Sequence, residues 1–352
     1  MLSAVLKTNW ARLAMASASL CAALSAEAAE LRVLTDRTDD GPIRAVLEAF
    51  EKESGAQVKV VFIDQGLLAR MSSRPSEADV VITLEVGLLE QAKRRGLLSP
   101  MSPKALQAVP PEFRDPDGTY FVDAYRARAI IASRSRVAPD AIQSYEDLAK
   151  PQWKGKLCIR SGLHDYNIAL FDQFIASWGE DKARAVIGGM AANLARAPKG
   201  NDREQAAGIA QGVCDLALIN SYYYPKMLAS PAQKPWADAI QVIFPDQSGR
   251  GTFIMRSGVA ITKVASNREL AERLAAFLVT PKVQASMVER TQQYSVLPSV
   301  PAHPSMIAVG KGQGLKDGRF KIQWVDLGRM ASSREAAIKI VNEVGFDKGP
   351  AS

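Results

Sequence analysis

The sequence predicts an α/β protein built from two lobes. Short runs rich in Val, Ile and Leu alternate with amphipathic segments of ten or so residues, a pattern typical of a parallel sheet covered by helices on both faces. The alternation begins near residue 31 and begins again near residue 156. The chain has 352 residues, which is more than a single hydrophobic core usually supports. We therefore expect two α/β lobes joined by short crossovers.

The first half of the pattern has clear helix boundaries. A helix begins at Pro42, because proline is favoured in the first turn, and it ends at Gly55, a favoured residue just past a helix end. Its apolar residues recur at the spacing of one buried helical face. A second helix covers 86–95 and closes at Gly96. Strands are expected at 31–35, 57–63 and 78–83.

The second half repeats the alternation. Ser144 and Asp147 form a capping pair for a short helix. The next helix begins at about Tyr166, and Pro281 opens a later one. Further helices are expected at 203–212, 268–279 and 332–344. Strands are expected at 156–160, 214–220 and 258–262.

Residues 1–28 have the features of a signal peptide. Lys7 and Arg12 precede a short apolar stretch, and Ala26-Glu27-Ala28 is a small-x-small cleavage site. The apolar stretch is shorter than the roughly 18 residues that span a bilayer. We therefore expect cleavage near Ala28 and export of the mature chain to a bacterial periplasm.

The charge and the cysteine content narrow the function classes. The net charge is +7 without any long run of like charges, which favours an anionic ligand or simple solubility over nucleic-acid binding. Two cysteines, Cys158 and Cys214, remain after processing, and an oxidising compartment would allow them to pair. Whether they pair stays open at this point. Histidine and cysteine are too few and wrongly spaced for a structural zinc site.

Three loops follow predicted strands and are candidates for ligand binding, because open α/β sheets bind ligands beyond the carboxyl ends of their strands. They cover 36–41, 161–166 and 220–224. The last contains the run Tyr222-Tyr223-Tyr224 at a turn from strand to helix. Phenolate oxygen is a hard anionic donor that suits a hard, highly charged metal ion. Aromatic packing is the alternative explanation for the run.

Several stretches resemble the periplasmic ferric iron-binding proteins of ABC importers, in particular the cyanobacterial-type branch. The resemblance covers nearly the whole mature chain and is most specific at Tyr166 and at Tyr222-Tyr223. The stretches are YEDLAKPQWKGKLCIRSG, DYN at 165–167, APKGNDREQ, NSYYYPKML, FPDQSGRGTFI, SGVAITK and TQQYSVLP.

The resemblance implies a type II periplasmic-binding-protein fold with a cleft between the lobes and no catalysis. It implies that Tyr166, Tyr222 and Tyr223 bind Fe(3+), and that Arg128 lines the same cleft. It also implies delivery to an inner-membrane ABC permease, and we expect a monomer. We place the first lobe at 29–122 plus 252–305 and the second at 123–251 plus 306–352.

One loop departs from the family pattern. The family often has a Ser-Arg-His-Tyr type sequence after the first strand, whereas this chain keeps Arg37 and has Thr38 and Asp39 instead of His and Tyr. The first lobe would then contribute Asp39, a bound anion such as carbonate, or no ligand. His164, two residues before Tyr166, is a further candidate ligand.

Two other functions remain open from the sequence. The arginines Arg37, Arg128 and Arg250 are candidates for binding an anion, by charge-assisted hydrogen bonds. A protein of the same fold would then bind a small organic or phosphorylated anion, with the tyrosines stacked on it. A periplasmic hydrolase that uses His164 is a third class, which no catalytic motif supports.

Overall fold

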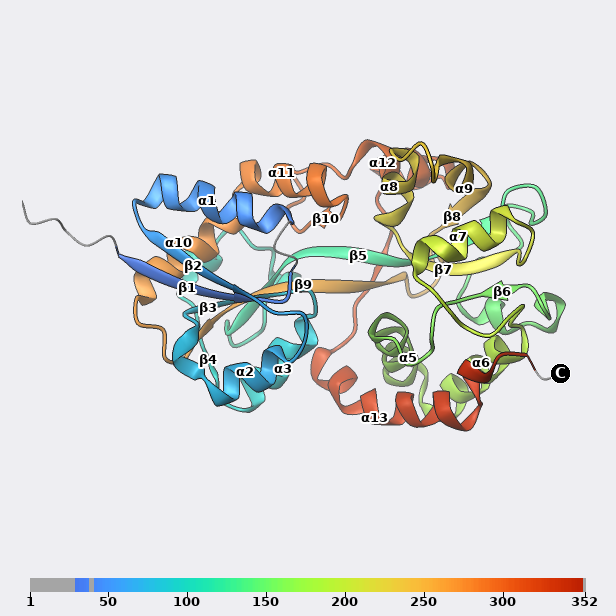
Figure 1. Ribbon diagram of the computed structural model, residues 1–352, viewed down its shortest axis with the longest axis horizontal. Coiled ribbons are helices and arrows are strands. Elements are labelled where there is room, and N and C mark those ends of the chain that lie inside the picture. The colour runs from blue at the N-terminus through green and yellow to red at the C-terminus, as the bar shows by residue number, and fades with distance from the viewer. Residues whose placement is uncertain (1–28, 38–40, 351–352) are drawn as a thin grey trace, which may run out of the picture.

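The computed structural model describes residues 29–37 and 41–350, and it shows two α/β lobes side by side along the long axis of the molecule (Figure 1). The predicted signal peptide and Asp39 lie outside the described residues. Two long strands, β5 (Tyr120–Ser133) and β9 (Thr252–Thr262), run through the middle and belong to both lobes.

The first lobe contains the N-terminal elements, and the chain returns to this lobe after β9. Its strands are β1 (Glu30–Thr35), β2 (Gln57–Phe62), β3 (Val80–Thr83), β4 (Leu98–Ser99) and β10 (Tyr294–Ser295). Its helices are α1 (Pro42–Ser54), α2 (Leu67–Ser73), α3 (Val86–Arg94), α4 (Pro103–Leu106), α10 (Arg268–Leu278) and α11 (Pro281–Thr291). The strands β1, β2 and β3 pair in parallel, as the alternating pattern predicts.

The second lobe contains the middle of the chain and its C-terminal end. Its strands are β6 (Leu157–Cys158), β7 (Leu216–Asn220), β8 (Ile240–Ile243) and β11 (Ile322–Gln323). Its helices are α5 (Asp165–Trp178), α6 (Glu180–Ala192), α7 (Asp202–Ala210), α8 (Tyr223–Leu228), α9 (Lys234–Asp238), α12 (Pro304–Gly312) and α13 (Leu327–Glu343). Among the described residues no helix is both long and apolar enough to cross a membrane.

The predicted boundaries of α1 are confirmed, and the local chemistry explains them. Pro42 is the first helical residue, and Gly55 ends the helix with a φ of 72°. This left-handed conformation suits glycine, which has no Cβ to clash with the backbone. The buried face of α1 packs into the core of the first lobe through Ile43, Val46, Leu47 and Phe50.

The strands that join the lobes differ from the expected parallel sheet. The strand order is β2-β1-β3-β9-β5-β7-β6, and β9 is antiparallel to both β3 and β5. The strand β5 is also antiparallel to β7. The strands that cross between the lobes are therefore antiparallel to their neighbours, which the alternating pattern did not predict, whereas β6 and β7 pair in parallel within the second lobe.

The strand β5 and the first half of β9 were not predicted from the sequence. All fourteen residues of β5 are buried, yet they include Asp123, Arg126 and Arg128. These charges interrupt the apolar run that marks a buried strand. Burial is possible because each charge is hydrogen-bonded, for example Asp123 to Arg37 and Arg126 to the carbonyl of Leu84.

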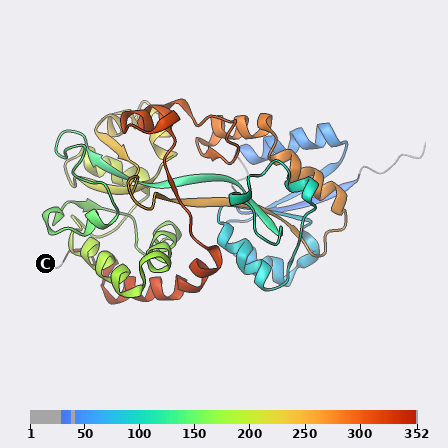
Figure 2. The same ribbon diagram turned by 180° about the vertical axis from the view of Figure 1, so that it is seen from behind.

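The C-terminal part of the chain contacts both lobes. After α12 the chain runs across β5 and β9 to α13. Figure 2 shows this crossing segment in front of the two strands. Here β11 pairs with β9, and the ring of Trp324 lies edge-on to Phe113 of the first lobe at 5.0 Å. The helix α13 begins at Leu327, five residues before the predicted start, because Asp326 caps it by accepting the Arg329 N–H.

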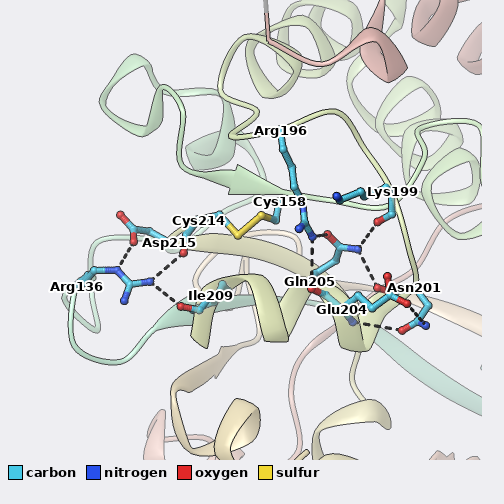
Figure 3. Close-up of a disulfide and its surroundings, with 10 residues drawn as sticks. All are labelled: Arg136, Cys158, Arg196, Lys199, Asn201, Glu204, Gln205, Ile209, Cys214 and Asp215. Carbon is cyan, nitrogen blue, oxygen red and sulfur yellow. Dashed lines mark hydrogen bonds and ion pairs between the residues drawn. A yellow bond between two sulfur atoms is a disulfide. The ribbon is translucent and has the colours of Figure 1, made fainter. Parts of the chain in front are cut away.

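A disulfide joins the two cysteines whose pairing the sequence left open. The bond links Cys158, at the end of β6, to Cys214, just before β7, and both residues are buried (Figure 3). Beside it, Arg196 donates to the side chain of Gln205 on α7. The bond therefore closes a loop that contains α5, α6 and α7.

We expect loss of the disulfide to destabilise the protein. The two cysteines are 56 residues apart. Closing a loop of this size lowers the conformational entropy of the unfolded chain, which destabilises the unfolded state by about 4 kcal/mol. The variant with both Cys158→Ala and Cys214→Ala should therefore unfold at lower urea concentration than the oxidised wild type. Reductant should lower the wild-type midpoint toward that of the variant and leave the variant unchanged. A wild-type midpoint that does not respond to reductant would contradict this prediction.

Candidate functional site

Three tyrosines lie at the carboxyl ends of two neighbouring strands. The strands β6 and β7 pair in parallel, so the loops that follow them leave the same edge of the sheet. The loop after β6 leads to Tyr166 in the first turn of α5. The strand β7 leads to Tyr222, at the N-cap position of α8, and to Tyr223, its first helical residue. The two segments therefore bring phenols from separate parts of the chain to one place.

The geometry and the electrostatics show that the three phenols are close neighbours. The rings of Tyr222 and Tyr223 lie 4.4 Å apart between centroids. Burial raises the pKa of Tyr222 well above its ordinary value, and the phenols of Tyr166 and Tyr223 raise it further. Burial also raises the pKa of Tyr223, which Tyr222 lowers through a hydrogen bond and Tyr166 raises. All three side chains remain partly exposed.

Cationic side chains surround this tyrosine cluster, which we define as Tyr166, Tyr222 and Tyr223. Three guanidinium groups approach the ring of Tyr166, at 5.0 Å for Arg160, 5.8 Å for Arg126 and 5.9 Å for Arg128. Arg203 lies 5.3 Å from the ring of Tyr223, and Lys226 lies 5.1 Å from the ring of Tyr222. Such cations attract the ring face. Arg126 opposes the rise in the pKa of Tyr222, and Arg160 opposes the rise in the pKa of Tyr223, because a nearby positive charge favours the phenolate.

The predicted cleft arginine Arg128 lies beneath Tyr166 and is fully buried. Its Nη1 donates to Asp202 at 2.6 Å, and its Nη2 donates to Asn167 at 2.8 Å. Both terminal nitrogens therefore hold the protein together beneath the tyrosines.

The candidate ligand His164 caps α5 beside the cluster. Its Nδ1 accepts the backbone N–H of Tyr166 at 3.1 Å, and the two rings meet edge to face with centroids 4.7 Å apart. Burial and the nearby Arg160 lower the pKa of His164. The imidazole is therefore neutral at pH 7, and Nε2 is the nitrogen that remains for another contact.

The other predicted cleft residues have different surroundings. The guanidinium of Arg37 is buried in an ion pair with Asp123, at 2.7 Å. Arg250 is exposed, lies 3.9 Å from Glu146 and approaches the ring of Trp178, so its contacts are away from the tyrosine cluster. Asp39 belongs to the part of the chain outside the described residues.

Most of the charged groups around the tyrosines were not predicted from the sequence. Arg160 was expected only as the end of a strand, and Asp202 only as part of the stretch APKGNDREQ. Arg126 lies in the strand that was not predicted. The one available signal for these residues was their position in the chain, because Arg160 and Asp202 lie next to segments that lead to a tyrosine or to a neighbour of a tyrosine.

The cluster offers three oxygen donors of the kind that trivalent metal ions prefer. Each phenol has to lose its proton to bind such an ion, and the surrounding cations lower the cost of the resulting negative charge. Within residues 29–37 and 41–350, no group of three or more His, Cys, Asp or Glu side chains is placed to hold a metal ion.

Comparison with known proteins identifies the class. The family model for bacterial extracellular solute-binding proteins matches residues 76–308, and the chain belongs to this family. Its structure has the two-lobed type II fold of periplasmic binding proteins, as predicted. Solved structures that match closely include ferric iron-binding proteins, which confirms the predicted resemblance.

Individual relatives make the likeness specific. The chain is 36% identical over 304 residues to iron uptake protein A1 of Synechocystis sp., covering 84% of this chain and 82% of the relative. The apo ferric ion-binding protein A of Pasteurella haemolytica matches with a TM-score of 0.80 and 38% identity, over 91% of this chain and 99% of that one. A Trichodesmium protein (IdiA, FutA) in complex with iron and citrate matches with a TM-score of 0.80 and 32% identity, over 90% and 99%.

A buried carboxyl group lies two turns along α5 from Tyr166. Asp172 is 5% exposed, and its Oδ1 has no hydrogen-bond partner among the described residues. Burial raises the pKa of Asp172 to about 8, an effect that Arg334 opposes and Glu85 reinforces. In the unfolded chain the pKa of an aspartate side chain is about 3.9. Asp172 is therefore protonated in the folded protein at pH 7.

We expect Asp172→Asn to stabilise the protein in alkaline solution. Because the pKa is higher in the folded state, the stability that the proton contributes is complete below about pH 4 and is lost as the pH rises toward 8. The amide cannot ionise, so the variant should gain on the wild type between pH 5 and pH 8.5 in urea unfolding. Exposed Asp140→Asn is the control. A gap between Asp172→Asn and wild type that does not widen with pH would disprove the assignment.

Proposed function

We propose that this protein binds ferric iron in the cleft between its lobes and delivers it to an inner-membrane ABC permease. Tyr166, Tyr222 and Tyr223 would supply the phenolate ligands. The convergence of these three phenols from two segments of the second lobe is the observation that carries the proposal. The protein would act as a monomeric receptor in the periplasm, without enzymatic activity.

The relatives support this function. They are named as an iron uptake protein, as Fe(3+)-binding periplasmic proteins and as ferric ion-binding proteins. The fold supports it as well, because β5 and β9 pass between the lobes and would act as the hinge on which they close. Under this proposal closure buries the ion, and docking on the permease opens the site.

An anion such as carbonate would complete the coordination. Three phenolates carry three negative charges and so balance the charge of Fe(3+), but they fill only part of its coordination shell. The Nε of Arg160 supports this proposal, because it is buried beside Tyr166 and has no hydrogen-bond partner within the part of the chain that the structure describes. Asp39 is a candidate protein group for a remaining position, whereas the Nε2 of His164 carries a proton while Nδ1 accepts the Tyr166 N–H, so it would donate to a bound anion.

Replacing single tyrosines should separate ligands from packing residues. Tyr222→Phe and Tyr223→Phe should each weaken ferric binding by at least about a hundredfold, because loss of a group that merely orients a ligand already costs about 10- to 100-fold. Tyr224→Phe is the matched control, since Tyr224 lines a pocket together with Leu228 and Val309 to which the three tyrosines of the cluster do not contribute. Affinity is measured by competition with citrate and by the visible phenolate-to-iron absorption band.

Two results would count against the proposal. Unchanged ferric affinity in both the Tyr222 and Tyr223 variants would exclude the tyrosine cluster as the site. A protein that stays colourless with ferric iron, but binds a carboxylate or phosphate in calorimetry, would be a receptor for an anionic solute. The arginines around Tyr166 are the observation that favours this second candidate.

Ferric binding should release protons. Burial raises the pKa of both Tyr222 and Tyr223, so both phenols are protonated at pH 7 in the free protein. Each phenol that binds iron then loses one proton, and the apparent affinity should fall about tenfold per pH unit of acidification for each proton released. Titration in weakly buffered solution with a pH indicator counts these protons. Release of fewer than two would contradict phenolate binding by this pair.

A further inference from the structure

A buried carboxylate joins three segments of the chain beneath the tyrosine cluster. Asp202 is the first residue of α7 and is fully buried. Its Oδ2 accepts Nη1 of Arg128 at 2.6 Å and the backbone N–H of Asn220 at 2.7 Å. Its Oδ1 accepts Nη1 of Arg160 at 3.2 Å. One carboxylate thus connects β5, the loop after β6, and β7.

The same network reaches the immediate neighbours of the tyrosines. Arg128 donates its second terminal nitrogen to Asn167, the residue after Tyr166. The amide of Asn167 then donates to the backbone carbonyls of Arg160 and Ser161, which closes the loop on itself. All three side chains of the inner network, Asp202, Arg128 and Asn167, are completely buried.

The second end of the network is the strand before the tyrosine pair. Asn220, whose N–H the carboxylate of Asp202 accepts, lies two residues before Tyr222. The network therefore bonds to the chain within two residues of a tyrosine in each of the two segments. A shift of the carboxylate would move both segments relative to each other.

The network also sets the charge beneath the phenols. Arg128 and Arg160 share the single negative charge of Asp202, so one positive charge remains in excess. Arg160 lies 5.0 Å from the centre of the Tyr166 ring, and Arg128 lies 5.9 Å from it. The excess positive charge therefore lies beside the ring of Tyr166.

We propose that Asp202 is a positioning residue for the tyrosine cluster. It aligns the segment of Tyr166 with that of Tyr222 and Tyr223, and it holds Arg160 and Arg128 at the ring of Tyr166. This inference rests on the proposed ferric site, and it assigns to Asp202 and Arg160 a role in the strength and colour of that site. A residue that only stabilises the lobe would have neither effect.

Two variants of the full mature chain test this role by opposite changes in charge. Asp202→Asn removes the negative charge and leaves both arginines uncompensated. The ferric complex should bind at least tenfold more weakly, and its visible band should move to shorter wavelength, because added positive charge lowers the energy of the phenolate electrons. Arg160→Gln removes a positive charge beside Tyr166, so its band should move to longer wavelength.

Asp79→Asn is the matched control for the loss of a buried carboxylate. Asp79 is also fully buried, and it accepts bonds from Arg32 and Ser266 within the first lobe. This variant should lose thermal stability but keep the wild-type ferric affinity and the wild-type band. It therefore measures what a structural role alone would do.

The outcomes distinguish this inference from the proposed function. If Asp202→Asn and Arg160→Gln both keep the wild-type band and affinity, Asp202 has only a structural role and the inference is wrong. If wild type itself forms no coloured ferric complex, the ferric function fails and the inference fails with it. Should Asp202→Asn not fold, Arg160→Gln decides alone, because its partly exposed side chain can be replaced while Arg128 keeps Asp202 paired.

Discussion

The pairing of β5 with β9 is the constraint on which the rest of the structure depends. The two strands are antiparallel and buried along their whole length, and they connect the sheets of both lobes. A buried charge costs several kcal/mol unless a partner compensates it. Two of the three charged residues of β5 therefore fix their surroundings through ion pairs: Asp123 holds Arg37 of the first lobe, and Arg128 holds Asp202 of the second. Each lobe is thus attached to the same strand by an ion pair of its own.

The tyrosine cluster places acidic hydroxyl groups where their ionisation is both hindered and assisted. Burial opposes the loss of a proton from both Tyr222 and Tyr223, and the neighbouring phenols of Tyr166 and Tyr223 oppose it further at Tyr222. The cations around them, from Arg126 and Arg160 to Lys226, act in the opposite direction. Binding of a highly charged cation would favour ionisation of the phenols, whereas binding of a weakly charged cation would not. The arrangement therefore favours a ligand by its charge as much as by its size.

Sequence patterns predicted those parts of the molecule that depend on local chemistry. The limits of α1 follow from Pro42 and Gly55, and the capping pair Ser144 and Asp147 forms reciprocal bonds as expected. The predicted short helix there is a single 3-10 turn, Glu146–Ala149. The tyrosines stood out because three phenols at a turn are unusual in any composition.

Contacts between distant positions could not be found in this way. Arg128 and Asp202 are 74 residues apart, and Arg37 and Asp123 are 86 apart, so no periodicity relates them. Charged residues inside β5 concealed the strand, because charged residues whose partners are unknown are expected at the surface. Arg250 was grouped with the cleft by its residue type, whereas the fold turns it toward Glu146 and Trp178.

The position of β9 has a consequence for the newly made chain. In the sheet, β9 lies between β3 and β5, although it is synthesised long after both. Until residues 252–262 pair with it, β3 has an open edge where hydrogen-bonding groups and buried apolar side chains have no cover. The sheet of the first lobe is therefore complete only after the whole middle of the chain has been made, and an incomplete chain exposes an edge that other chains can pair with.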